Sequence, residues 1–440
     1  MNRREFVKSS AVMSAMMAAA PSIVGAQEGK KVFKVALIAC GGRGKGAAKQ
    51  LLMAAKMLGH EAKIVATADF FIEKAQAAAK EFGGDEKFAF GGANSYKEVM
   101  KTDCEIVILA APPYVRPLHT AAAIEAGKHV FAEKPVAVDP AGIRQFLAAA
   151  AKAKEKKLAL VAGTQRRHQW SYLRQAKALA EGKISKIVGG AIYWNGTVPF
   201  VRPRLPGMTN AAYLANNWVN WTEVNGDHIV EQHVHNIDVA NWFIGRYPKT
   251  ATGFGARNRR VSGNQYDFFS IDFDYGEGVH IHSMCRQIAG CSNFVGEKFR
   301  TIDGELTGGG KYMVNGQEVK IEEVEQPKFD FSTGVDPKEG GNPYTIEHYD
   351  LLKGILTGNV LNEGENVAHS TACAIMGRLS AYTGLTVRMS DILENKESPF
   401  YNMNCVPAAI DFEGAADVVL PQENTAPRPG KDDERFLKLG

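Results

Sequence analysis

Residues 32–44 read VFKVALIACGGRG, an apolar run followed by a turn that contains three glycines. The apolar run predicts a buried strand, and residues 45–58 have helical spacing. A Gly-x-Gly-x-x-Gly turn between a strand and a helix is typical of a dinucleotide-phosphate site, and here Ala39, Gly41 and Gly44 occupy the glycine positions. Gly41 lets the backbone approach the pyrophosphate, Gly44 permits close packing, and the helix N-terminus favours an anion. The cofactor-binding residues predicted from this turn are Ala39, Gly41, Gly42, Arg43 and Gly44.

The alternation of strands and helices continues to about residue 165. Further strands are predicted at 62–68, 105–111, 129–132 and 158–161, and helices at 72–82, 118–126 and 141–156. Strands that alternate with helices require crossover connections and give a parallel sheet. We therefore expect residues 31–165 to form a doubly wound Rossmann domain of the α/β class that binds a dinucleotide.

An acidic residue, Asp69, follows the second predicted strand. A carboxylate at this position accepts hydrogen bonds from the ribose hydroxyls of adenosine, and capping of the next helix is its alternative role. Phe70 and Phe71 bring no positive charge for a 2′-phosphate. The sequence therefore favours NAD over NADP.

From residue 166 the pattern changes to longer, half-alternating strands separated by Gly and Asn turns. Strands are predicted at 187–194, 250–254, 265–275, 278–285 and 299–302, and helices at 171–181, 229–243, 344–356 and 367–384. Grouped strands of this kind predict, for residues 166–400, an α+β domain with an open, mostly antiparallel sheet. Residues 401–440, rich in Pro, Gly and Asp, are predicted to wrap the surface as a C-terminal tail.

Residues 1–26 resemble a twin-arginine export signal. Arg3 and Arg4 precede an apolar Ala/Met-rich run, and Val24-Gly25-Ala26 offers small residues for cleavage. The run, about 15 residues, is short for a membrane span, and no later stretch is long enough for one. We therefore expect a mature protein without a membrane span, exported by the twin-arginine machinery to a periplasmic or other extracytoplasmic location.

Composition and cysteine usage exclude several classes of protein. The 440 residues are 45% hydrophobic and 23% charged, as in an ordinary globular protein. The net charge of +4 includes +2 from the leader, and no basic stripe with interleaved aromatics supports nucleic-acid binding. The six cysteines form no CxxC pair and no metal-ligand spacing, so we expect no metal site. Export permits disulfides, but a twin-arginine substrate folds before it leaves the reducing cytoplasm, so we expect mostly free thiols.

A Glu133-Lys134-Pro135 triplet follows the predicted strand 129–132. The carboxyl ends of parallel strands form the edge where open α/β sheets bind ligands. A lysine at this edge, beside a bound nicotinamide, suggests proton transfer to or from a substrate hydroxyl.

These segments together resemble the Gfo/Idh/MocA oxidoreductases. The similarity rests on the glycine turn, Asp69, the segment Ala110-Ala111-Pro112 with His119, the run AGKHVFAEKP over 126–135, and EQHVHNID over 231–238. The resemblance implies a Rossmann domain followed by an α/β domain whose open sheet often carries an oligomer interface, so we expect a homo-oligomer. It adds to the cofactor-binding residues Ala111, Pro112, His119, Glu133 and Lys134.

The resemblance also implies catalytic roles. Lys134 matches the family's catalytic lysine, His235 matches its catalytic histidine, and Glu231 stands where the family usually has an aspartate. On one continuous helix Glu231 and His235 would share a face, and the carboxylate would raise the pKa of the imidazole. A metal site formed by His228, Glu231 and His235 is the competing interpretation.

Two further groups of residues are weaker candidates. Arg167, His168 and Tyr172 lie where the family often contacts substrate, although structural roles are equally expected. Trp218 and Trp221 offer either a flat surface for a sugar or aromatic packing in the core.

The expected activity is hydride transfer between a sugar or polyol carbon and a tightly bound NAD. Either Lys134 or His235 takes the hydroxyl proton while the other, with Glu231, polarises the oxygen; the favoured assignment has Lys134 polarising the hydroxyl and His235 as base. An exported enzyme meets no ready pool of nucleotide, so folding before export would let it carry its cofactor. Two alternatives remain open. One is redox-assisted glycosidic cleavage, as in the NAD-dependent N-acetylgalactosaminidases; the other is sugar binding without catalysis.

Overall fold

The computed structural model describes residues 29–403 and 418–430. The first domain is built on a six-stranded parallel sheet with the strand order β3-β2-β1-β4-β5-β6. The strands are β1 (Val32–Ile38), β2 (Glu61–Asp69), β3 (Ala89–Gly91), β4 (Ile106–Leu109), β5 (His129–Ala132) and β6 (Leu160–Ala162). This order is that of a doubly wound dinucleotide-binding sheet, which confirms the predicted Rossmann domain.

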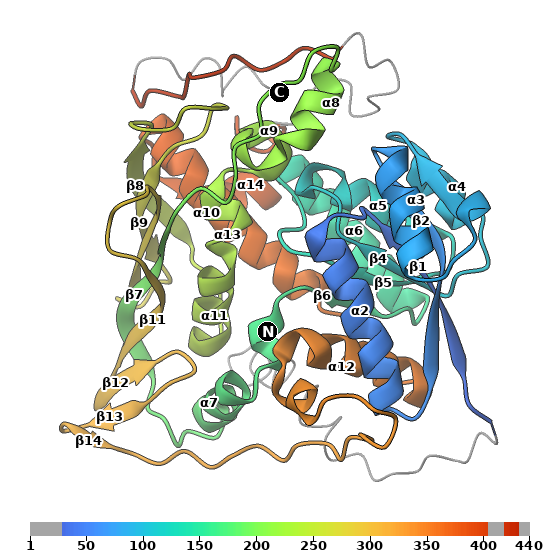
Figure 1. Cartoon of the computed structure of the whole chain (residues 1–440). Coiled ribbons are helices and arrows are strands. Elements are labelled where there is room, and N and C mark those ends of the chain that lie inside the picture. Colours follow the sequence, from blue (N-terminus) through green and yellow to red (C-terminus); the bar gives the residue numbers. More distant parts are fainter. Residues whose placement is uncertain (1–28, 404–417, 431–440) are drawn as a thin grey trace.

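Helices cover both faces of this sheet (Figure 1). They are α2 (Gly42–Met57), α3 (Ile72–Glu81), α4 (Ser95–Met100), α5 (Arg116–Glu125) and α6 (Pro140–Glu155). Along β1, Val35 and Leu37 belong to the core beneath α2 and α3, whereas Ala36 and Ile38 belong to the core beneath α5 and α6. Both faces of β1 are therefore buried, which explains its nearly continuous apolar sequence.

The second domain contains a nine-stranded sheet in the order β14-β13-β12-β11-β7-β10-β9-β8-β15. Among the described strand pairs of this second sheet, only β7–β10 is parallel, so the prediction of a mostly antiparallel sheet is confirmed. The strands are β7 (Ile187–Gly196), β8 (Thr250–Ala256), β9 (Phe268–Asp274), β10 (His280–Gln287), β11 (Phe294–Thr301), β12 (Gly304–Thr307), β13 (Tyr312–Val314), β14 (Gln317–Glu318) and β15 (Val387–Arg388). The helices are α7 (Trp170–Ala180), α8 (Asn210–Asn216), α9 (Thr222–Asn225), α10 (His228–Glu231), α11 (Val234–Ile244), α12 (Pro343–Thr357), α13 (Gly364–Thr383) and α14 (Met389–Leu393).

Helix α12 lies after the predicted domain boundary at residue 165 but packs on the first domain. It packs against α2, and its Ile346, Leu351 and Leu352 join the core of the Rossmann domain. The chain then forms a bridge between Leu160 and Asn362 beside β6 before entering α13. A segment of the predicted second domain therefore completes the first one.

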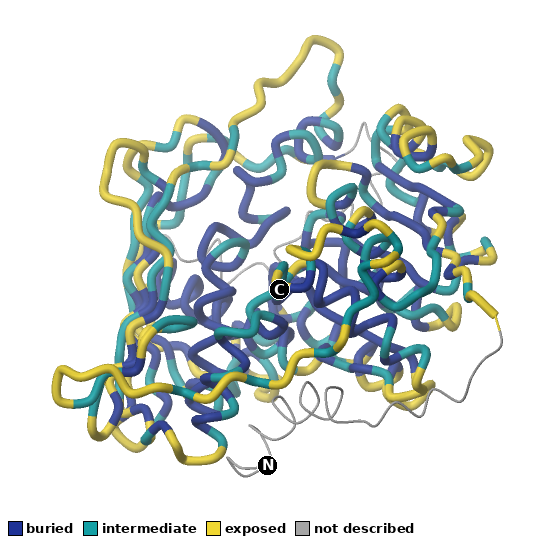
Figure 2. Tube along the Cα trace, turned by 60° about the horizontal axis from the view of Figure 1, so that its bottom comes forward, coloured by how far each residue is buried: buried dark blue, intermediate teal, exposed yellow. Residues whose placement is uncertain are grey.

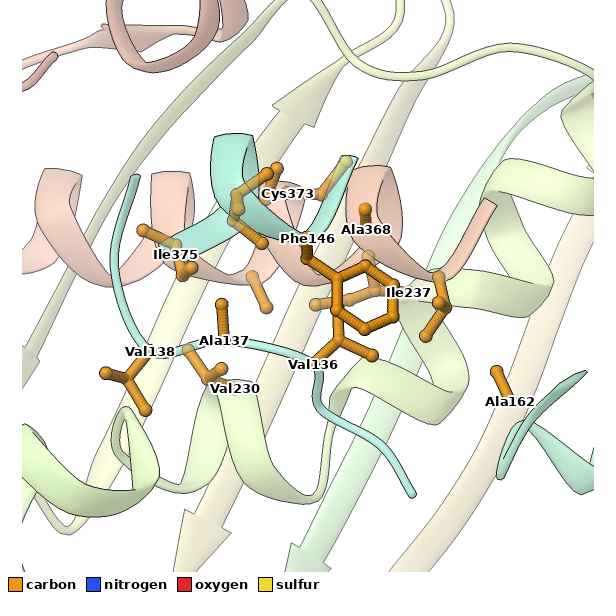
Figure 3. Packing of buried hydrophobic residues seen from close by; sticks show 14 of the residues in the cluster. Val136, Ala137, Val138, Phe146, Ala162, Val230, Ile237, Ala368, Cys373 and Ile375 are labelled. Atoms are coloured by element: carbon orange, nitrogen blue, oxygen red, sulfur yellow. The ribbon is translucent and has the colours of Figure 1, made fainter. Parts of the chain in front are cut away.

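A shared core joins the two domains around the Glu133-Lys134-Pro135 triplet (Figure 3). Val136, directly after the triplet, lies with Phe146 of α6, Ile237 of α11 and Cys373 of α13. Figure 2 shows buried residues continuing through the centre of the molecule from one domain into the other. This packing fixes the chain on the carboxyl side of Lys134.

The predicted leader (1–26) and most of the predicted tail (401–440) lie outside the described residues. Within the described part, no helix has the length and hydropathy required of a membrane span. Five of the six cysteines are described, and all five are free thiols, as expected: Cys40, Cys104, Cys285, Cys291 and Cys373.

Candidate active site

A cavity of about 510 Å³ lies at the carboxyl edge of the Rossmann sheet. Nine of the predicted cofactor-binding residues line it: Ala39, Gly41, Gly42, Arg43, Gly44, Asp69, Ala111, Pro112 and His119. The other two, Glu133 and Lys134, follow β5 at the same edge of the sheet. His119 stacks on Tyr96 with 4.4 Å between ring centroids, and burial lowers the pKa of His119 to about 3, so the imidazole is neutral.

The start of α2 fits the pyrophosphate of a dinucleotide. Gly41 precedes the helix without a side-chain cap, and the first turn carries no acidic residue. Its backbone N–H groups are therefore available to an anion, and the helix dipole favours one. A Cβ atom at Gly41 or Gly42 would meet nothing within 4 Å, so this part of the cavity is open to a ligand.

The turn forms although alanine replaces its first glycine. Ala39 adopts φ = 72°, a left-handed conformation that favours glycine, and its N–H donates to Ala68 O at 2.7 Å. Gly44 is required for a different reason. A Cβ there would stand 2.0 Å from the carbonyl oxygen of Ala39, so the helix could not approach the strand as closely.

Asp69 holds the turn in place. Its Oδ2 accepts a hydrogen bond from Cys40 N at 2.7 Å, and its Oδ1 accepts one from Phe71 N at 3.0 Å. The carboxylate therefore ties the glycine turn to the residue that precedes α3. Each oxygen can accept a second hydrogen bond, so binding of a ribose hydroxyl remains compatible with this local role.

An ion pair connects the glycine turn to the triplet. Arg43 Nε lies 2.9 Å from Glu133 Oε1, and the Arg43 guanidinium lies 5.2 Å from the centre of the Tyr344 ring on α12. On the other side, the buried Arg116 donates from Nη1 to the carbonyl oxygen of Pro135. The peptide bond between Lys134 and Pro135 is cis. Contacts from α2 and α5 thus fix both ends of the triplet.

Lys134 is bound by the second domain. Its Nζ lies 3.0 Å from Glu231 Oε1 and also donates to the carbonyl oxygen of Glu231 at 2.5 Å. The prediction that Glu231 and His235 share one helical face was wrong, because the helix is interrupted. Glu231 ends α10, Gln232 and His233 form a turn, and His235 lies in the first turn of α11.

His235 is buried against Trp194 of β7, with 5.6 Å between ring centroids and 21° between the ring planes. Burial lowers the pKa of His235 well below its usual value, and the positive charges of Lys134 and Arg166 lower it further. The expected rise in this pKa was therefore wrong, since Glu231 pairs with the lysine and not with the imidazole. The ring is neutral at pH 7 and can accept a proton.

Sequence reasoning missed Arg166 and Trp194. Arg166 Nη1 lies 2.5 Å from Glu297 Oε1, and its guanidinium lies 6.0 Å from the centre of the Trp194 ring. Glu297 is buried and also accepts hydrogen bonds from Tyr172 Oη at 3.0 Å and Asn236 Nδ2 at 2.7 Å. The position of Arg166 shortly after β6, at the same sheet edge, could have identified it.

The weaker candidates for substrate contact form hydrogen bonds and ion pairs with other residues of the protein. Arg167 makes a bidentate ion pair with Asp238 at 2.8 and 2.9 Å. His168 Nδ1 lies 2.7 Å from Asp350 Oδ2. Burial alone would lower the pKa of His168, but the carboxylates of Glu363 and Asp350 raise it well above its usual value. Tyr172 binds Glu297, as noted above, so all three residues have structural partners.

The metal alternative finds no support in the geometry. His228 Nδ1 lies 3.0 Å from Asp227 Oδ1, while Glu231 is bound to Lys134. Within residues 29–403 and 418–430, no group of three or more His, Cys, Asp or Glu side chains is arranged to hold a metal ion. Of the two tryptophans, Trp221 is fully buried in the core, whereas Trp218 lines the dinucleotide cavity.

The fold and the cavity define a dinucleotide-binding Rossmann domain followed by an antiparallel-sheet domain. Residues 33–161 match the Gfo/Idh/MocA family model, described as an oxidoreductase family with an NAD-binding Rossmann fold. This part of the chain is therefore similar to the NAD-binding Rossmann domains of that oxidoreductase family.

Two named relatives share part of the sequence. Inositol 2-dehydrogenase of Salmonella typhimurium is 27% identical over 223 residues, which are 50% of this chain and 58% of the relative. The NADP(+)-dependent scyllo-inositol 2-dehydrogenase of Bacillus subtilis is 27% identical over 250 residues, 56% of this chain and 62% of the relative. The chain thus covers less than two thirds of the length of either.

Solved structures resemble nearly the whole described fold. Levoglucosan dehydrogenase in complex with NADH and levoglucosan has a TM-score of 0.63 at 18% identity, covering 82% of this chain and 100% of the other. Myo-inositol 2-dehydrogenase from Lactobacillus plantarum has a TM-score of 0.60 at 19% identity, covering 81% and 99%. At these identities the likeness shows the two-domain fold.

Proposed function

We propose that the protein transfers hydride between a hydroxyl-bearing carbon of a sugar or polyol and a tightly bound NAD. The observation that carries the proposal is a lysine ammonium, held by Glu231 at the sheet edge of the NAD-binding cavity, whose charge helps to lower the pKa of the neutral, buried His235. The named relatives, which include inositol 2-dehydrogenases, support polyols or sugars as the substrate class.

Three side chains have separate roles at the substrate oxygen: those of Lys134, Glu231 and His235. When bound, NAD supplies the hydride acceptor or donor. Lys134 polarises the substrate oxygen with its ammonium group, and Glu231 holds that group in place through the ion pair. His235 accepts the hydroxyl proton during oxidation because its lowered pKa keeps it neutral. Trp194 packs along the imidazole and restricts its orientation.

Replacing Lys134 by Met tests this assignment. Loss of the ammonium should lower kcat by about 10²–10⁴-fold because the substrate oxygen is no longer polarised. NAD binding should be retained, since Lys134 is not among the residues that line the dinucleotide cavity. Lys154→Met, on the exposed face of α6, is the matched control and should leave turnover unchanged. Near-normal turnover in the Lys134 variant would refute the role.

Export and cofactor retention belong to the same proposal. The Arg3-Arg4 leader supports twin-arginine export to an extracytoplasmic compartment, where a firmly held NAD would be needed. Denaturing the purified protein should release about one NAD(H) per chain, and cell fractionation should place the mature protein outside the cytoplasm. Incubation with nitrophenyl glycosides without added NAD should release no nitrophenol; release would support the glycosidase instead.

We also propose that the nine-stranded sheet mediates homo-oligomer formation. Its strands and their ends carry exposed apolar side chains, namely Val188, Phe254, Met284, Phe294 and Val295. Sedimentation velocity should show an oligomer that Phe254→Asp weakens. A monomer at micromolar concentration would contradict this proposal.

A further inference from the structure

One wall of the dinucleotide cavity comes from the second domain. Phe200 and Arg202 lie on the long loop between β7 and α8, Ala215 lies on α8, and Trp218 begins the short helix that follows it. These residues line the same cavity as the glycine turn and Asp69. We refer to Phe200, Arg202, Ala215 and Trp218 together as the second-domain wall. Figure 1 shows its helix α8 on the chain that links β7 to α9.

The second-domain wall is held by internal contacts. The rings of Phe200 and Trp218 meet edge to face with 6.4 Å between centroids, and the Arg202 guanidinium lies 4.5 Å from the centre of the Phe200 ring. Buried amides fix this arrangement. Asn217 Oδ1 accepts from Arg202 N at 3.0 Å, and Asn220 Nδ2 donates to Phe200 O at 3.0 Å. The aromatic and cationic groups are thus positioned without a ligand.

The chemistry of the second-domain wall suits a dinucleotide. NAD carries two phosphate charges and flat rings, which bind guanidinium groups and aromatic faces respectively. Arg202 Nη1 donates to Asn216 Oδ1 at 3.1 Å, and within the described residues its Nε and Nη2 make no hydrogen bond. Donors therefore remain on Arg202 for an anion in the cavity.

The geometry points to the second-domain wall as the device that retains the cofactor: Arg202 binds a phosphate of the dinucleotide, and Trp218 packs against it from the side opposite the Rossmann sheet. This inference rests on the proposed NAD-dependent function and assigns its tight binding to named residues. A dinucleotide on the sheet edge alone would be covered on one side. With the wall in place, its departure requires those four residues to move away.

Exchange of the bound nucleotide tests the inference. Purified protein that carries its own NAD is mixed with excess deuterium-labelled NAD, and replacement is followed by mass spectrometry. Arg202→Ala and Trp218→Ala should each accelerate exchange by about tenfold, since lost contacts act mainly on dissociation. Arg204→Ala is the matched control, because Arg204 lies on the same exposed loop but donates to Met208 O and does not line the cavity.

The possible results distinguish a failure of the wall to retain NAD from a failure of the proposed NAD-dependent function. Faster exchange in Arg202→Ala and Trp218→Ala, with wild-type exchange in Arg204→Ala, supports the wall. Wild-type exchange in Arg202→Ala would overturn it even if Trp218→Ala failed to fold, since Arg202 is exposed and its loss should not unfold the protein. A wild-type protein that contains no NAD(H) and binds none would instead overturn the proposed function.

Discussion

Lys134 and Glu231 lie 97 residues apart in the sequence, and each comes from a different domain. Glutamate has one more methylene group than the aspartate usual in the family, and its longer side chain reaches Lys134. Glu231 reaches Lys134 with its carboxylate while its own carbonyl oxygen accepts a second hydrogen bond from the same ammonium. The lysine is therefore held by one residue at two points, which limits the positions that its ammonium can take.

The pH dependence of catalysis should report His235. A histidine that acts as base must be neutral, and burial together with Lys134 and Arg166 lowers its pKa well below the usual value. Activity should therefore persist as pH falls from 8 to 6 and decline only at more acidic pH. The measurement is kcat/KM for sugar or polyol oxidation, which reports the groups of the free enzyme.

Two variants complete the pH experiment. His235→Asn should reduce kcat/KM strongly and abolish the acid limb, because no titrating base remains. His369→Asn, at a half-buried position of α13 where the ring stacks on Tyr247, should retain the wild-type profile. An acid limb centred at the ordinary histidine pKa, about 6.5, would show that His235 is not in the environment described.

Single residues of the site could be predicted from sequence better than their partners. Lys134, Glu231 and His235 were identified by motif. The structure joins Lys134 to Glu231, and the charge of Lys134 acts on His235. Their pairing was mispredicted because apolar spacing suggests one helix across 229–243, whereas the chain turns at Gln232 and His233. Nothing in the sequence identified Trp194 as a site residue, because aromatic residues are common in strands, both in the core and on the sheet surface.

At the scale of elements, the glycine turn depends on how closely α2 approaches β1. Ala39 takes a left-handed conformation, and its carbonyl oxygen then faces the position of a Cβ on Gly44. Asp69 fixes the turn from β2, and Arg43 fixes it to Glu133 after β5. Three strand ends are thus coupled through one turn.

Gly44→Ala should disrupt this turn. Its Cβ would stand 2.0 Å from Ala39 O and 3.3 Å from Ala110 Cβ, and backbone cannot move aside cheaply. We expect a loss of about 1–3 kcal/mol in the free energy of unfolding and at least a tenfold weaker affinity for NAD, roughly the effect of 1.4 kcal/mol. Urea unfolding and calorimetric titration with NAD measure the two effects.

Gly46→Ala provides the matched control on the same helix. A Cβ there meets only the Arg43 guanidinium, at 3.8–3.9 Å. Because alanine is a better helix former, this variant should gain about 0.5–1 kcal/mol and keep its affinity for NAD. Equal behaviour of the two variants would show that helix propensity, not the close approach at Gly44, governs the turn.

Most long elements were predictable, as were the short strands β4, β5 and β6, but five other short strands were not. The periodic segments that became α2, α6, α12 and α13 were predicted, as were β1, β2, β7, β9 and β10, whereas only residues 299–301 of β11 fell within a predicted strand. The strands β3, β12, β13, β14 and β15 contain two to four residues each, too few for a recognisable alternation. Local pattern also carries no information about docking, so the return of α12 to the first domain was unforeseen.

At the scale of the whole molecule, the second domain contributes residues to the site on the first domain. It supplies Glu231 to Lys134, Tyr344 to the guanidinium of Arg43, and one wall of the dinucleotide cavity. The shared core around Val136 and α13 makes these contacts part of one packed unit. Cofactor binding and substrate chemistry therefore depend on the junction between domains, and a variant that loosens it should affect both.

Buried histidines make the free energy of unfolding depend on pH. Burial lowers the pKa of His119 and His233 to about 3, and lowers that of His348 well below its usual value. In the unfolded chain these histidines bind protons below about pH 6.5, whereas in the folded protein they do not. The unfolded state then binds more protons, so their contribution to stability is present above pH 6.5 and falls as pH decreases below it. The raised pKa values of His168, His280, Glu223, Glu297 and Glu347 act in the opposite direction.

His348→Leu isolates one of these contributions. The ring of His348 packs on Phe131 at 4.1 Å, and within the described residues neither of its nitrogens has a hydrogen-bond partner, so leucine fits the apolar site without stranding a polar group. Between pH 6 and 5, each unit of decrease in pH should lower the free energy of unfolding of the wild type, relative to that of the variant, by up to about 1.4 kcal/mol. Urea unfolding at several pH values measures the slope directly, whatever the variant does to stability at pH 7.5. His369→Gln should keep the wild-type slope, and an unchanged slope in His348→Leu would mean that His348 takes up a proton in the folded protein.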